Sequence, residues 1–156
     1  MERMRQFVAF LVEGQRYALG LEHVGSVLQA VAPTPLAQAP STIMGIFDWH
    51  GSIVPIFNLR RRLGFPDREL EATDQFLIAR SSRRTVALAV DAVEGLTGAA
   101  EAAISKPEAL LPAQPLIDGI VQLEEGLLLI HNLEAFLSLE EERALDGALL
   151  GSRDAS

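Results

Sequence analysis

The chain repeats one pattern of short strands and turns, and this repeat limits the folds open to it. A shift of 69 residues aligns Phe7 with Phe76, and a shift of 74 residues aligns Gly45 with Gly119. The offset changes within Pro-bearing connections, where insertions are tolerated. Each half predicts a hairpin, a bend, a Pro-bearing connection, a second hairpin and a helical turn. Short strands separated by Gly turns are typical of small β-barrels, so we predict two barrels.

The most informative segment runs from residue 45 to residue 64. Ile46 to Trp49 and Ile53 to Phe57 are rich in β-forming residues, and His50 and Gly51 between them predict a hairpin turn. Asn58 can then cap a short helix that ends at residue 64.

Three consecutive arginines, Arg60 to Arg62, lie in this short helix. Neighbouring helical positions are about 100° apart, so the three side chains cannot share one face, and at most one or two would meet a partner. A charge run of this kind is often a solvated face. An apolar hairpin followed by a compact cationic turn nevertheless favours a docking surface over a catalytic site.

Two segments stay ambiguous, and the C-terminus does not. Val24 to Val31 fits either a bent strand or a helical turn followed by a strand, and Ala99 to Ile104 is equally undecided. Ser138 can cap a final helix over residues 138–150, because acidic residues fill its first turn, where the helix dipole favours them.

Composition excludes several classes of function. The 156 residues allow one domain or two small subdomains sharing a core. The net charge of −8 argues against a general nucleic-acid binder, and the lack of cysteine excludes disulfides, thiolate metal sites and thiol nucleophiles. No apolar run approaches the roughly 20 residues that span a bilayer, and the N-terminus lacks a signal-peptide core. We therefore expect a cytoplasmic protein with no cofactor, no nucleic acid and no direct membrane insertion.

The segment from residue 45 resembles the CheW-type chemotaxis coupling protein family, whose pattern is Gly-x-x-x-x-Arg-Gly-x-Ile-Val-Pro-x-x-Asp-Leu-Arg. The matching positions are Gly45, Gly51, Ile53, Val54, Pro55, Leu59 and Arg60. The resemblance covers essentially the whole chain, including the N-terminal hairpin and the acidic final helix. Two positions depart from the pattern: His50 stands where the family usually has Arg, and Asn58 where it usually has Asp. Arg is permanently charged whereas His is near-neutral at pH 7, so receptor preference or affinity is expected to differ.

The resemblance implies a mainly β fold in which two SH3-like five-stranded barrels pack around a shared core, with short helical turns and a C-terminal helix. One domain would then cover residues 1–156, with barrels at about 17–70 and 74–137 and exchange of strands at the termini possible. The implied function is a non-enzymatic scaffold that binds a chemoreceptor's cytoplasmic tip and a histidine kinase's regulatory domain. Such a protein would be a monomer alone and part of an array when assembled.

The resemblance also implies a partner-binding surface. We expect a groove for the receptor tip led by Val24, Val27, Gly45 and His50, with Arg60 as a further contact. On this view, Gly45→Asp weakens receptor binding and leaves the fold intact. Each residue also has a simpler interpretation: the valines as core, and His50 as a solvated turn residue.

Other functions stay open on the sequence. The same adaptor type serves chemosensory-like pathways that control pili, gliding or cyclic-dinucleotide signalling. A small-molecule sensor would use a cleft between the barrels. An enzyme would need a histidine assembled with Asp48, Asp91 or Asp118, because no catalytic or metal-binding motif is present.

Overall fold

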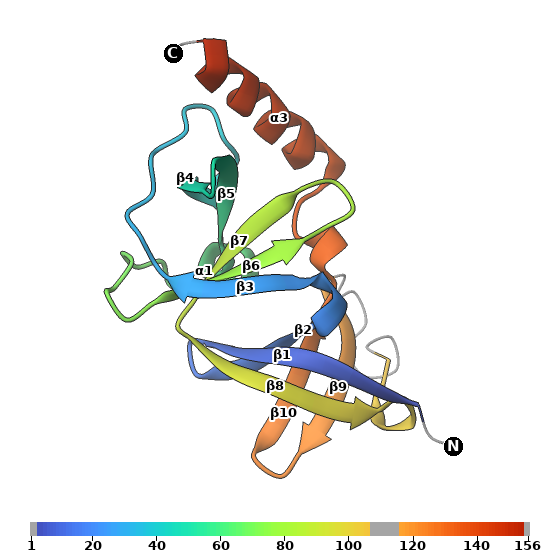
Figure 1. Cartoon of the computed structure of the whole chain (residues 1–156). Helices are drawn as coiled ribbons and strands as arrows, with labels where there is room; N and C mark the ends of the chain where they lie inside the picture. Colours follow the sequence, from blue (N-terminus) through green and yellow to red (C-terminus); the bar gives the residue numbers. More distant parts are fainter. Residues whose placement is uncertain (1–2, 107–115, 155–156) are drawn as a thin grey trace.

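The computed structural model describes residues 3–106 and 116–154 and contains two five-stranded sheets and a C-terminal helix (Figure 1). The strands are β1 (Met4–Val12), β2 (Gln15–Gly20), β3 (Val24–Gln29), β4 (Ile43–Trp49), β5 (Ser52–Asn58), β6 (Gln75–Arg80), β7 (Thr85–Val90), β8 (Ala92–Ala100), β9 (Ile117–Leu123) and β10 (Gly126–His131). The helical elements are η1 (Leu21–His23), α1 (Leu59–Leu63), η2 (Glu101–Ala103), η3 (Leu133–Ala135) and α3 (Leu139–Asp154). The predicted mainly β fold is confirmed. The Pro-bearing connection at residues 107–115 lies outside the described residues.

The two sheets have equivalent topologies. Sheet A has the strand order β8-β1-β2-β10-β9, and sheet B has the order β3-β6-β7-β5-β4. Replacing every strand by its repeat in the other half, such as β1 by β6 and β8 by β3, converts one order into the other. Even the single parallel pair recurs, as β2 with β10 in sheet A and as β7 with β5 in sheet B. The predicted internal repeat is therefore present in three dimensions.

The two hairpins exchange places between the halves. Sheet B combines β3, β4 and β5 of the first half with the β6–β7 hairpin of the second, and sheet A combines the β1–β2 hairpin with β8, β9 and β10. Sheet B thus spans residues 24–90, a division that differs from the expected ranges 17–70 and 74–137. We call this arrangement the hairpin exchange. The expectation allowed an exchange of strands at the termini, whereas here a whole hairpin of each half lies in the sheet of the other half.

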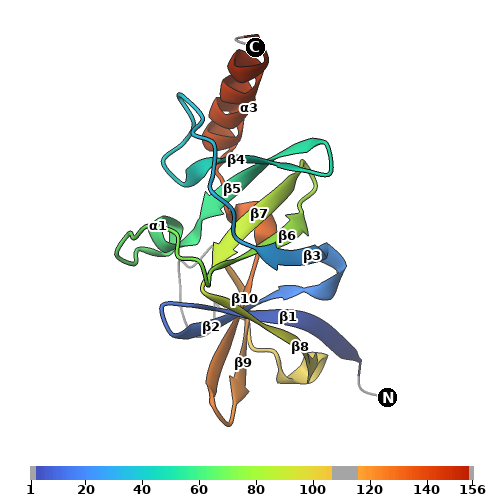
Figure 2. The same ribbon diagram turned by 60° about the vertical axis from the view of Figure 1, so that its left-hand side comes forward.

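Buried side chains form one core between the sheets and one on the other face of each sheet. Along β1, Val8 and Phe10 face sheet B, whereas Phe7 and Ala9 face the opposite side, as the two-residue period of a strand requires. The core between the sheets is the largest and also receives Leu145 of α3. Figures 1 and 2 show sheet B above sheet A, with α3 extending past sheet B.

The local start and stop signals are where the sequence predicts them. The Asn58 side chain accepts the backbone N–H of Arg61 and caps α1, which Gly64 ends in a left-handed conformation. Ser138 and Glu141 bond reciprocally to each other's backbone N–H, which caps α3. The ambiguous segment from Val24 to Val31 contains the strand β3, whose register shifts between Val24 and Ser26, and the helical turn η1 precedes it. None of the described helices is long and apolar enough to cross a membrane.

Candidate partner-docking surface

Val24 and Val27 lie on β3, an edge strand of sheet B. The strand register places Val27 opposite Leu77 and Val24 opposite Ala79. Directly opposed residues share a face of the sheet, and both Leu77 and Ala79 belong to the core between the sheets. Val24 packs against that core, whereas Val27 is 42% exposed. The predicted pair therefore faces sheet A, with Val27 open to solvent.

The nearby edge of sheet A carries a second apolar pair. Leu96 on β8 lies opposite Val8 of the core between the sheets but is itself 69% exposed. Met4 on β1 shares this face, because it is four residues from Val8 along the strand, and it is 62% exposed. Figures 1 and 2 both show β3 next to β1, with β8 beyond β1. We call this apolar line between β3 and the β1–β8 edge, bordered by Val24, Val27, Met4 and Leu96, the seam.

The seam is built from equivalent positions of the repeat. The shift of 69 residues that aligns the halves takes Val24 to Val93 and Val27 to Leu96. Val93 packs against the core between the sheets, as Val24 does, and Leu96 is exposed, as Val27 is. Leu96 was not predicted as a site residue, although the repeat pointed to it. No feature of the sequence pointed to Met4 in this way, because its exposure depends on the pairing of β1 with β8.

Gly45 supports the fold and offers no accessible contact. It is buried, its φ is +153°, and a Cβ added there would lie 2.7 Å from both Pro33 Cβ and the carbonyl oxygen of Thr34. Thr34 and Ile46 form a β-bridge at this point, with N–H···O distances of 2.8 and 2.9 Å. The structure contradicts the expectation that Gly45→Asp leaves the fold intact, since the side chain would collide with this bridge.

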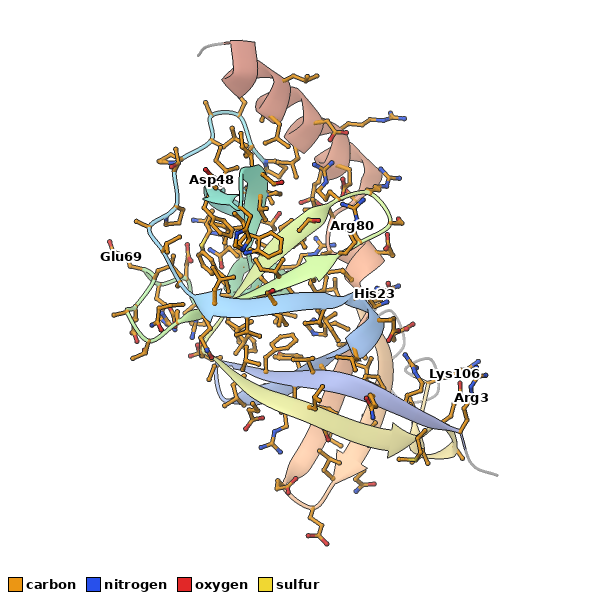
Figure 3. All side chains as sticks on the ribbon, in the orientation of Figure 1. Arg3, His23, Asp48, Glu69, Arg80 and Lys106 are labelled. Carbon is orange, nitrogen blue, oxygen red and sulfur yellow. The ribbon has the colours of Figure 1, made fainter. Side chains whose placement is uncertain are left out.

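His50 occupies the turn between β4 and β5. His50 and Gly51 have φ of +53° and +85°, and Asp48 Oδ1 accepts the N–H of Gly51 at 2.8 Å, which closes the turn. The His50 ring is exposed and meets the edge of the partly buried Trp49 ring, with centroids 4.9 Å apart. Figure 3 labels Asp48 at sheet B and His23 at the start of β3. In strand order, β3 and β4 are opposite edges of sheet B, so His50 belongs to a different edge from Val27.

Arg60 is engaged inside the protein. Its guanidinium donates to both carboxylate oxygens of Asp91, at 2.9 and 2.8 Å, and also pairs with Glu13. Only 12% of its side chain is exposed. Such a bidentate ion pair fixes the guanidinium in place, so the structure assigns Arg60 an internal role. Asp91 is thus the acceptor for an arginine that is 31 residues away in the chain.

The other two arginines of α1 also have internal partners. Arg61 pairs with Asp67 at 2.7 Å, and Arg62 donates to the carbonyl of Ala135 at 3.2 Å and lies 3.7 Å from Glu141. The three side chains therefore diverge, as their helical spacing requires.

An ion-pair cluster extends from Asp91 to the loop before β6. Arg68 joins Asp91, at 2.9 Å, to Asp74, which it contacts through two hydrogen bonds of 2.8 and 2.9 Å. Hydrogen bonding to Asp74 raises the pKa of Arg68. Burial alone would raise the pKa of Asp74, but the Arg68 side chain and the Glu71 N–H lower it overall. The charged forms of both residues are thus built into the fold.

The described residues offer little to catalysis. They contain no group of three or more potential metal ligands. His131 is buried between aromatic rings, and burial lowers its pKa to about 3, so its imidazole is neutral at physiological pH. A cavity of about 360 Å³ is lined by Pro33, Met44 and Leu70 among others, but its arginines, Arg61 and Arg68, are already paired with carboxylates. This cavity lies beside sheet B, whereas a sensor cleft was expected between the barrels.

Comparison with known proteins gives a consistent result. The family described as CheW-like domain matches residues 6–141. The chain is 25% identical over 142 residues to the probable chemotaxis protein CheW of Rhizobium etli, covering 90% of this chain and 92% of the relative. It is 27% identical over 141 residues to the chemotaxis protein CheW of Bacillus subtilis, covering 89% and 90%.

Two further matches differ in kind. Protein FrzA of Myxococcus xanthus is 28% identical over 92 residues, which is 59% of this chain and 58% of that protein. The crystal structure of the scaffolding protein TtCheW from Thermoanaerobacter tengcongensis superposes with a TM-score of 0.80 at 23% identity, covering 90% of this chain and 96% of that one. The structural match shows a shared fold.

Proposed function

Because the chain belongs to the CheW-like domain family, a family of non-enzymatic scaffolds, we propose that it couples the cytoplasmic tip of a chemoreceptor to the regulatory domain of a histidine kinase. The observation that carries the receptor half of this proposal is the seam. It exposes Val27 on β3 and Leu96 on β8, which are edge strands of the two sheets, beside the core between the sheets, against which Val24 and Val93 pack. Exposed apolar side chains of this kind suit the apolar face of an amphipathic helix.

His50 adds a second, separate contact in this proposal. It is exposed on a closed turn whose backbone is fixed by Asp48. An imidazole there would recognise a receptor tip through hydrogen bonding or ring contact, and not through the permanent charge of an arginine. Val24, Val27 and His50 thus stay in the proposed site, whereas Gly45 and Arg60 contribute through the fold.

The seam is tested by placing a charge on each of its walls. Val27→Glu and Leu96→Glu should each raise the dissociation constant for a soluble receptor-tip hairpin from the same genome by roughly tenfold or more, because docking would bury an unpaired carboxylate. Leu127→Glu is the matched control, since Leu127 is 49% exposed on the β9–β10 hairpin of sheet A. Equal losses in all three variants, or none in the seam variants, would exclude the seam as the receptor site.

The kinase half of the proposal uses the outer edges of the sheets. The edges β3 and β8 border the seam, which leaves β4 of sheet B and β9 of sheet A. A kinase regulatory domain with matching sheets would meet these edges head to tail, and contacts of this type close into rings when the rotation permits. Each contact would be weak alone and strengthened by avidity in an array. We expect the protein to be a cytoplasmic monomer that is recruited to such arrays.

The kinase contact is tested by titrating the chain against the regulatory domain of the kinase encoded beside it. We expect micromolar binding that strengthens when the receptor-tip hairpin is added. Absence of binding to any kinase regulatory domain of the genome would remove the coupling function.

A second candidate keeps the adaptor role and changes the pathway to one controlling pili, gliding or cyclic-dinucleotide signalling. The match to a relative named FrzA, beside those named CheW, supports keeping it. The identity of the kinase that binds in the same titration distinguishes the two pathways.

A further inference from the structure

Asp91 stands where the chain crosses from one sheet to the other. β7 of sheet B ends at Val90, and β8 of sheet A begins at Ala92. The backbone N–H of Asp91 donates to the carbonyl of Leu11 on β1 at 2.9 Å. A backbone hydrogen bond therefore attaches this connection between the sheets to sheet A.

The Asp91 carboxylate holds groups from both sheets at once. From sheet A it accepts the N–H of Glu13 in the β1–β2 turn at 2.9 Å. From the sheet B side it accepts Arg60, which follows β5, and Arg68, which precedes β6, all at 2.8 to 2.9 Å. Four charge-assisted or backbone hydrogen bonds thus converge on one half-buried side chain.

Each arginine also has a second acid. Arg60 pairs with Glu13, and Arg68 pairs with Asp74, whose side chain is only 5% exposed. Loss of the Asp91 charge would therefore leave neither guanidinium alone in a buried site. The contribution specific to Asp91 is the connection between the two arginines and the β1–β2 turn.

The cluster lies at one end of the seam. Beside it, the side-chain oxygen of Gln75 on β6 accepts the N–H of Val93 on β8 at 2.7 Å, a second polar bond between the sheets. Farther along β8, at Leu96, and along β3, at Val27, the two edge strands carry exposed apolar side chains. The seam is thus held by directional polar bonds at one end and lined by apolar groups beyond it.

We propose that Asp91 is a positioning residue that sets the angle between sheets A and B and thereby the width of the seam. Its carboxylate bonds to the β1–β2 turn, to α1 and to the loop before β6, and so fixes the positions of these three segments relative to one another. The part of this inference that concerns partner affinity rests on the proposed receptor function. The part that concerns the angle between the sheets does not.

The test measures the angle between the sheets directly. The chain has no cysteine, so spin labels can be attached uniquely at Arg83→Cys in the β6–β7 turn and Glu124→Cys in the β9–β10 turn, both exposed. In Asp91→Asn we expect the distance distribution between the labels to broaden, and in Asp91→Glu to return toward the original width. Glu94→Gln is the control, because it breaks an ion pair with Arg16 inside sheet A. An unchanged distribution in Asp91→Asn, or equal broadening in the control, would overturn the proposal.

Binding supplies the second readout. If only about a third to a tenth of the Asp91→Asn molecules keep the angle between the sheets that binding needs, their dissociation constant for the receptor-tip hairpin rises roughly three- to tenfold. If Asp91→Asn does not fold, Arg60→Gln removes the link between α1 and Asp91 and leaves Asp91 paired with Arg68. Broadened distances in a chain whose original form binds no receptor tip would refute the coupling function and support the role of Asp91. Tight receptor binding with unchanged distances and affinity in Asp91→Asn would refute the role of Asp91 alone.

Discussion

The imidazole of His131 packs against the phenol ring of Tyr17, with ring centroids 4.5 Å apart, and among the described residues neither ring nitrogen has a hydrogen-bond partner. Phe10 and Phe136 enclose the same ring at 6.0 and 5.3 Å. A histidine in these surroundings is tolerated only in its neutral form, because nothing there compensates a charge.

This burial predicts a stability that depends on pH. Desolvation lowers the pKa of His131 from its usual 6.5 to about 3, so between these values the unfolded chain binds more protons than the folded one. The contribution is present in full above pH 6.5 and is lost as pH falls toward 3, by roughly 4 kcal/mol over the whole window. Urea denaturation at pH 7 and pH 5 measures the upper part of this loss.

His131→Leu is the informative variant for this effect. It should flatten the pH dependence between pH 7 and 5 and raise the free energy of unfolding at pH 7 by about 1 kcal/mol, because two unpaired buried nitrogens disappear. The lowered carboxylate pKa values of Asp74 and Glu141 belong to a lower pH range and do not mask the change. A pH dependence equal to that of the original chain would show that His131 is protonated without cost.

The close packing around Gly45 predicts that a side chain added there costs more stability than backbone strain alone would. Gly45→Ala should lower the free energy of unfolding by at least about 3 kcal/mol, because its Cβ would overlap Pro33 and the Thr34 carbonyl. Gly51→Ala is the control: its φ is also positive, but no atom lies within 4 Å of the added Cβ, so only strain of about 1–2 kcal/mol is expected. Similar losses in the two variants would mean that the Thr34 bridge moves aside.

His50→Arg predicts a change in recognition without a change in stability. The side chain is exposed, so the melting temperature should stay within about 1 °C, while affinity for receptor tips increases or extends to more of them. Calorimetric titration against several receptor-tip hairpins measures this. Unchanged affinity for all of them would make position 50 a bystander in this protein.

The local signals in the sequence predicted much of the fold. The caps at Asn58 and Ser138 and the turn at His50 depend on residues close in the chain, and each is where it was expected. The hairpin exchange could not be read in this way. Because the halves repeat, each hairpin has two similar three-stranded partners, and local pattern does not distinguish the partner in its own half from the partner in the other.

The site was predicted less completely than the fold. Val27 lies on an exposed edge because β3 has a neighbour on one side only, and its contact with a partner stays a prediction. The role of Arg60 depends on Asp91, which is 31 residues away and in another element, so no spacing rule reveals it. The crowding around Gly45 could not be predicted, because its neighbour Pro33 comes from the irregular connection, whose path the sequence left open.

The hairpin exchange also fixes an order of events during synthesis. Sheet B is continuous from residue 24 to residue 90, so it can close while the rest of the chain is still on the ribosome. The β1–β2 hairpin leaves the ribosome before sheet B, yet the strands that flank it in sheet A, β8 and β10, are made after sheet B. The β1–β2 hairpin must therefore wait, with one face of its apolar strands uncovered, until β8 and β10 have been made.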